Sequence, residues 1–123
     1  MVCQEEGTVT CELVMLTRTL GCYYVRSARR ALEEAGVPYR EINVDRDPVA
    51  RERLLAWVGF LSVPTLFLAE PGQDTPAAEP EPLPPGQSPR GIDRGSMLTE
   101  PTPEQLAAWL RRHGLWKEDG MAV

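Results

Sequence analysis

The chain has 123 residues, a formal net charge of −5 and 42% hydrophobic residues, enough apolar content for one domain with a core. The acidic balance and the lack of a basic block with interleaved aromatic residues exclude nucleic acid as the main partner. The N-terminus is polar and acidic, and no apolar run approaches the roughly 20 residues that a membrane helix needs. We therefore expect no signal peptide and no membrane partner.

The predicted elements alternate between strands and helices. In chain order they are strand Val9–Leu16, helix Cys22–Ala35, strand Tyr39–Val44, a helix capped by Asp45 or Asp47 and ending at Val58, strand Val63–Ala69, strand Ser96–Glu100 and helix Pro103–His113. The first five have the order β-α-β-α-β, which predicts parallel strands covered by helices. The start of the last helix, Thr102-Pro103-Glu104-Gln105, has the pattern of a capping box.

Residues 70–89 differ from the rest of the chain because they hold seven prolines. Such a segment favours neither a helix nor a strand ladder, and we expect residues 70–95 to be an extended, solvated surface insertion. Residues 1–7 are predicted to be a flexible tail. The whole chain, residues 1–123, is then predicted to be a single domain.

Three cysteines and one histidine are present, and no CxxC pair occurs. This count favours neither a disulfide scaffold nor a structural zinc site, so no metal site is predicted and a reducing cytoplasm is the expected location. Cys11 begins the strand that leads to Cys22, and the length of that strand keeps the two thiols too far apart to bond. Cys11 is therefore predicted to be a core residue, and Cys3 an incidental cysteine on the tail.

Cys22 is the candidate nucleophile, because it stands between an apolar strand and the start of an amphipathic helix. The exposed amides and the positive end of a helix favour thiolate over thiol. Arg18 and Arg26, four residues on either side, are candidates for supporting positive charge. His113, at the end of the last helix, is predicted to be a surface residue that compensates the helix dipole.

Together these features resemble the glutaredoxin branch of the thioredoxin superfamily, over Thr8–Ala69 and Met97–Gly114. Counting back from Ala35-Gly36-Val37-Pro38-Tyr39 places Cys22 on the family's nucleophilic cysteine and Tyr24 on its aromatic third position. Val63-Pro64-Thr65 matches the family's VP[TQ] strand, whose proline is cis and faces the thiol. Leu98-Thr99-Glu100-Pro101-Thr102 is similar to the TxPS-type turn of mycoredoxin-like proteins, which serve thiols other than glutathione.

The resemblance implies a thioredoxin-like α/β fold of order β-α-β-α-β-β-α, with a four-stranded mixed sheet flanked by helices. It implies Cys22 as the catalytic residue. The implied substrate-binding residues are Tyr24, Val63, Pro64, Thr65, Thr99 and Thr102. The implied partners are a low-molecular-weight thiol and disulfide-bearing proteins, with no resident cofactor and a monomeric chain.

The sequence also departs from the family. The CxxC motif is degenerate, Cys22-Tyr23-Tyr24-Val25, so a mixed disulfide on Cys22 has no resolving cysteine within the motif. This predicts a monothiol mechanism, in which a second thiol clears the adduct. The GGxDD glutathione motif is missing, and Phe60-Leu61-Ser62 replaces the basic residue often found before the Val-Pro strand.

Two alternatives remain open at this point. Monothiol proteins of the CGFS type carry a [2Fe–2S] cluster between two chains, although Tyr23 and Tyr24 crowd that site here. The other alternative is a catalytically silent thioredoxin-fold module that binds a protein.

Overall fold

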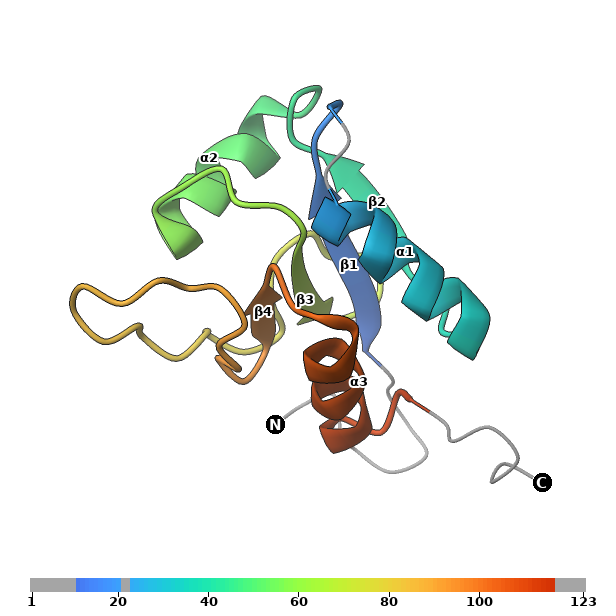
Figure 1. Cartoon of the computed structure of the whole chain (residues 1–123). Helices are drawn as coiled ribbons and strands as arrows, with labels where there is room; N and C mark the ends of the chain where they lie inside the picture. Colours follow the sequence, from blue (N-terminus) through green and yellow to red (C-terminus); the bar gives the residue numbers. More distant parts are fainter. Residues whose placement is uncertain (1–10, 21–22, 117–123) are drawn as a thin grey trace.

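The computed structural model describes residues 11–20 and 23–116. Within them the element order is β1 (Glu12–Thr17), α1 (Tyr23–Ala35), β2 (Arg40–Asn43), α2 (Pro48–Val58), β3 (Thr65–Ala69), β4 (Met97–Thr99) and α3 (Pro103–Arg112) (Figure 1). The predicted β-α-β-α-β-β-α order is confirmed. Residues 1–7, which were predicted to be a tail, and residue 22 of the predicted first helix lie outside the described residues.

The four strands form a mixed sheet in the order β2-β1-β3-β4. Strand β1 is parallel to β2, whereas β3 is antiparallel to β1 and β4 is antiparallel to β3. The mixed sheet is as predicted, but the expectation that β3 would also be parallel is wrong. The helical pattern of α2 indicates only that this helix covers a face of the sheet. It does not indicate whether the strand that follows runs parallel or antiparallel to β1.

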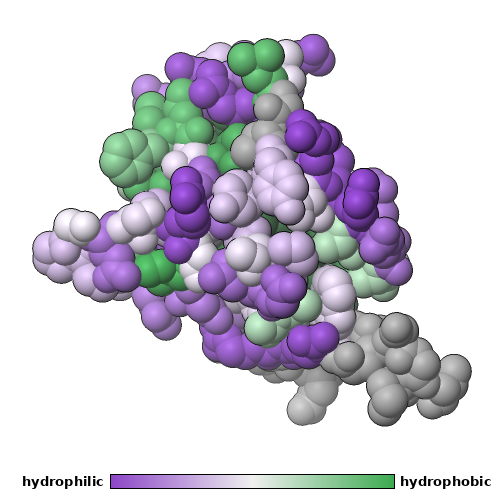
Figure 2. Space-filling model, in the orientation of Figure 1, coloured by the Kyte–Doolittle hydropathy of each residue, from purple (hydrophilic) through white to green (hydrophobic). Residues whose placement is uncertain are grey.

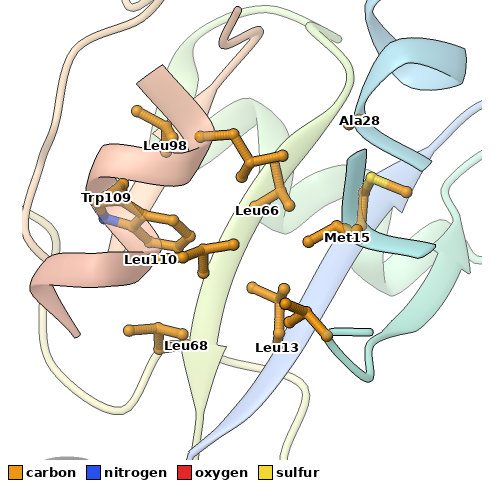
Figure 3. Close-up of a cluster of buried hydrophobic side chains, with 11 residues drawn as sticks. Leu13, Met15, Ala28, Leu66, Leu68, Leu98, Trp109 and Leu110 are labelled. Carbon is orange, nitrogen blue, oxygen red and sulfur yellow. The ribbon is translucent and has the colours of Figure 1, made fainter. Parts of the chain in front are cut away.

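The two faces of the sheet are built from alternating residues of the same strands, because successive side chains of a strand point to opposite sides. Leu13 and Met15 of β1 pack with α1 and α3 in one buried cluster (Figure 3). Val14 and Leu16 pack in a second cluster with α2. The sheet is therefore covered by α1 and α3 on one face and by α2 on the other.

Helix ends follow the signals in the sequence. Asp47 is the N-cap of α2, and its side chain accepts a 3.0 Å hydrogen bond from the amide of Ala50. Gly59 ends α2 with φ +89°, a left-handed conformation that favours glycine. Thr102 and Gln105 form the predicted capping box at the start of α3. The described residues contain no helix long and apolar enough to cross a bilayer.

The proline-rich insertion between β3 and β4 contains no helix or named strand, most of its residues are exposed, and one part of it projects from the sheet (Figure 1). The amide of Ala77 donates to the carbonyl of Leu68 at 2.7 Å. The hydroxyl of Ser96 donates to the carbonyl of Ala78 at 2.6 Å. These hydrogen bonds attach Ala77 to β3 and Ala78 to Ser96, the residue before β4.

Arg94 ties the insertion to α2. Its buried guanidinium donates through Nε to the carbonyl of Glu81 at 2.7 Å and through Nη1 to the carbonyl of Trp57 at 2.8 Å. Burial lowers its pKa from the ordinary value. Most residues of the insertion are exposed, and Arg94 is one of the few points at which it is bound to the rest of the fold.

His113 is also placed differently from the prediction. It is buried rather than on the surface, and its Nε2 lies 2.8 Å from the carbonyl oxygen of Gly95. The indole Nε1 of Trp109 donates to the same oxygen at 2.9 Å. The end of α3 is thus bound to the last turn of the insertion, a partner that helix-dipole reasoning does not reveal.

Cys11 packs against the first core cluster, as expected of a core residue, but it is disulfide-bonded. The other two cysteines, Cys3 and Cys22, lie outside the described residues. The cysteine count did not predict a disulfide at Cys11. Because a reducing cytoplasm disfavours disulfides, the cysteine count no longer supports that compartment.

Candidate functional site

Three chain segments meet near the start of α1. They are the first turn of α1, the Val63–Pro64 segment before β3, and the turn between β4 and α3. The predicted nucleophile Cys22 lies outside the described residues, directly before Tyr23, the first residue of α1. The site can therefore be described through the residues that surround that position.

The Val63–Pro64 peptide bond is cis, as the resemblance implied. Both residues are buried. The carbonyl of Pro64 accepts a 2.8 Å hydrogen bond from the amide of Glu100. This bond joins the loop before β3 to the turn after β4, so two of the three segments of the site are held together.

Thr65 and Thr99 lie opposite each other on β3 and β4. Their hydroxyl oxygens are 3.0 Å apart and both side chains are fully buried. The Thr65 hydroxyl donates to the carbonyl of Ser62 at 2.8 Å, which leaves the Thr99 hydroxyl as the donor between them. The side chains of Thr65 and Thr99, which were predicted to bind substrate, thus form hydrogen bonds that connect β4 and β3 to the loop at Ser62.

Thr102 is engaged in the helix cap. Its hydroxyl accepts from the amide of Gln105 at 3.1 Å, and its own amide donates to the Gln105 side chain at 2.9 Å. The hydroxyl and amide of Thr102 are therefore both committed to the start of α3.

The two candidates for supporting charge have different surroundings. Arg18 forms an ion pair with Asp45, with Nε 3.0 Å from Oδ1. The amide of Thr19 also donates to Asp45 at 2.8 Å, and these contacts lower the pKa of that carboxyl, the amide most strongly. Arg18 thus stabilises the bend after β1, while Arg26 is exposed on α1.

The structure adds a cation that no sequence pattern identified. The guanidinium carbon of Arg90, from the insertion, lies 5.5 Å from the centre of the Tyr24 ring, within cation–π range. Its Nε donates to Oε1 of Glu100 at 2.7 Å. The sequence offers only a weak signal for Arg90, because both of its partners are remote along the chain.

The insertion also reaches β4 through its backbone. Arg90 forms an isolated parallel bridge with Thr99, and the amide of Gly91 donates to the Thr99 carbonyl at 2.7 Å. The insertion thus places the basic side chain of Arg90 between Tyr24 and Glu100.

A groove of about 550 Å³ opens beside this cluster. Its lining consists of Phe60, Ser62, Gly86, Gln87, Ser88, Pro89, Arg90 and Glu100. The side chain of Phe60 is 64% exposed at one wall, and hydrophobic surface continues over α2 (Figure 2). The groove therefore combines an apolar wall, uncharged polar groups and one ion pair, a composition suited to a small polar ligand.

Metal-binding clusters of three or more His, Cys, Asp or Glu side chains do not occur among residues 11–20 and 23–116.

Comparison with protein families finds that residues 14–70 match the family model described as Glutaredoxin. The matched segment runs from β1 to the residue after β3 and includes position 22 and the cis Val63–Pro64 bond. No curated protein matches the chain.

Proposed function

From the match of residues 14–70 to the Glutaredoxin family model, we propose that the chain is a glutaredoxin-like protein of the thioredoxin superfamily and that it exchanges thiols and disulfides through Cys22 by a monothiol mechanism. The proposed substrates are mixed disulfides between proteins and a low-molecular-weight thiol. A second molecule of that thiol acts as the reductant.

The proposed reaction has two steps. The Cys22 thiolate attacks the sulfur of the small thiol in the mixed disulfide, a new S–S bond forms on Cys22, and the protein leaves as a thiolate that takes a proton from water. A second small thiol, as thiolate, then attacks its counterpart on Cys22. This releases the Cys22 thiolate and a small-molecule disulfide, so the sulfur of the second small thiol is oxidised, the sulfur of the protein substrate is reduced, and the first small-thiol sulfur stays at the disulfide level.

The observation that carries the proposal is the match of residues 14–70, with its cysteine directly before α1 and its cis Val63–Pro64 bond. A helix start favours thiolate. Val25, in the place of a second cysteine, is buried, which supports a monothiol rather than a dithiol route.

The test is intact mass measurement and peptide mapping after mild treatment with the disulfides of glutathione, bacillithiol and mycothiol. We expect one adduct on Cys22, reversible by dithiothreitol and selective for one of the three. The Cys22→Ser variant should form none and should lose disulfide reduction, while Cys3→Ser should retain both. No adduct in the unmodified chain, or equal labelling of Cys3 and Cys22, would contradict the proposal.

Two further measurements separate the alternatives. An iron–sulfur carrier would become coloured on anaerobic reconstitution with iron and sulfide, whereas we expect a colourless protein. A catalytically silent module would show a Cys22 alkylation rate no faster than that of a free peptide thiol, whereas we expect a faster rate near neutral pH.

A further inference from the structure

The proline-rich insertion contains a run of residues, 79–85, whose backbone is restricted to one extended conformation. The run reads Glu-Pro-Glu-Pro-Leu-Pro-Pro, so each of its residues either is a proline or directly precedes one. The proline ring fixes φ at about −65°, and a residue before a proline is disfavoured in the helical region. Both restrictions favour the polyproline II helix, which has about three residues per turn. No helix or strand includes any residue of this proline run.

The exposure of the proline run repeats with the same period of three. Pro80 and Leu83 are half-buried. In a helix with about three residues per turn, these two positions lie on one edge, while 79, 82 and 85 form a second edge and 81 and 84 a third. The residues of the second and third edges are all exposed: Glu79, Glu81, Pro82, Pro84 and Pro85. The run therefore turns one edge toward the fold and two edges toward solvent.

A buried side chain attaches the middle of the proline run to the fold. The amide of Glu81 donates to the carbonyl of Arg94 at 3.0 Å, and Nε of Arg94 donates to the carbonyl of Glu81 at 2.7 Å. Arg94 also donates to the carbonyl of Trp57, near the end of α2, at 2.8 Å. The run lies in the part of the insertion that projects from the sheet (Figure 1). A segment that is already held in an extended conformation loses less entropy when it binds.

The two exposed edges carry a defined chemistry. Pro82 and Pro85 have the PxxP spacing on one edge, which is the spacing that aromatic-lined grooves bind in polyproline II segments. Glu79 lies on the same edge, and Glu81 lies on the neighbouring one. The run contains two acidic residues and no basic residue. Charge complementarity therefore favours a groove with basic residues beside it.

We propose that the proline run is a docking segment for a protein domain whose aromatic-lined groove has basic residues beside it. Aromatic rings of the partner pack against Pro82 and Pro85, and its cations face Glu79 and Glu81. The inference goes beyond thiol–disulfide exchange, because it assigns a second surface whose binding does not involve Cys22.

The test uses purified domains of three classes that bind proline-rich segments: one SH3, one WW and one EVH1 domain. Each domain is chosen with Lys or Arg beside its groove, is labelled with nitrogen-15 and is titrated with the unlabelled full chain. The groove resonances report binding and its Kd. We expect saturable shifts confined to the groove of at least one domain, and weaker binding when the basic residues of that domain are replaced by Glu.

Proline variants test the spacing in the tightest of these complexes. Pro82→Ala with Pro85→Ala should weaken binding by at least about tenfold, because both anchors on one edge are lost. The matched control is Pro71→Ala with Pro76→Ala, which removes the same number of prolines from the insertion but outside the run. It should leave Kd unchanged.

Charge variants test the chemistry of the partner. Glu79→Gln with Glu81→Gln should weaken binding by about fivefold at low ionic strength, and high salt should reduce this difference. Unchanged affinity in this variant at low ionic strength would overturn the assignment of a basic partner.

The remaining outcomes separate docking from catalysis. A Kd weaker than about 1 mM for all three domains, or an equal loss of affinity in the two proline double variants, would overturn the docking segment. Cys22→Ser should bind the partner domain as the unmodified chain does. Loss of docking therefore leaves the proposed monothiol exchange intact, and an unreactive Cys22 leaves the docking segment intact.

Discussion

The amide of Glu100 donates a 2.8 Å hydrogen bond to the carbonyl of Pro64, and Glu100 makes this bond with φ at +47°. Left-handed backbone is unfavourable for a residue with a Cβ atom. Glu100 is the one described non-glycine residue in that region. The turn between β4 and α3 therefore carries a local strain at the position where it locks onto the cis-proline segment.

The backbone strain predicts a difference between two substitutions of Glu100. Both Glu100→Ala and Glu100→Gly remove the carboxylate that holds Arg90, but only glycine adopts a positive φ without a steric penalty. We expect Glu100→Gly to have a free energy of unfolding about 0.5–1 kcal/mol higher than Glu100→Ala. Urea denaturation measures this difference, and an alanine variant equal to or more stable than the glycine variant would contradict it.

The buried hydroxyl pair predicts an unequal effect of two valine substitutions. Thr65→Val leaves both the Thr99 hydroxyl and the Ser62 carbonyl without their partner, whereas in Thr99→Val the Thr65 hydroxyl still donates to Ser62. A buried polar group without a hydrogen bond costs about 1–3 kcal/mol. We expect Thr65→Val to lower the free energy of unfolding by about 1 kcal/mol more than Thr99→Val, measured by urea denaturation; equal effects would contradict the donor assignment.

His113 predicts a dependence of stability on pH. Burial lowers its pKa from the ordinary 6.5, and Arg112 lowers it further while the Gly95 carbonyl and Asp93 raise it. Below pH 6.5 the unfolded chain binds more protons at this position than the folded chain, so stability falls as the pH falls through this range. The stabilising contribution of the neutral ring is fully present above pH 6.5.

The measurement is urea denaturation between pH 5.5 and 7.5 of the unmodified chain and His113→Gln. We expect the glutamine variant to lose less stability on acidification, because it has no titrating group at this position. Trp109→Phe is the matched control. It removes the other donor to Gly95, and it should lower stability at each pH without changing the slope. Equal slopes for the unmodified chain and His113→Gln would contradict the assignment.

The sequence by itself determined most of the secondary structure and the family. The apolar run Leu13–Leu16 in β1, the Asp47 cap, the Gly59 stop and the Thr102–Gln105 box are local signals, and the structure contains each of them. Such signals are readable because the interactions behind them join residues only a few positions apart. The cis Val63–Pro64 bond was implied only by the resemblance of Val63-Pro64-Thr65 to the family's motif, and the structure contains it.

Only the tertiary structure decided which remote segments of the described chain contact one another. Arg90 reaches Tyr24 and Glu100, Arg94 reaches Trp57, and His113 reaches Gly95. Composition predicted an exposed proline-rich segment, but it did not reveal that the carbonyls of Glu81 and Ala78 are bound by the buried side chains of Arg94 and Ser96. Contacts between remote segments depend on how the strands, helices and loops pack in the complete fold. Local sequence propensity does not predict that packing.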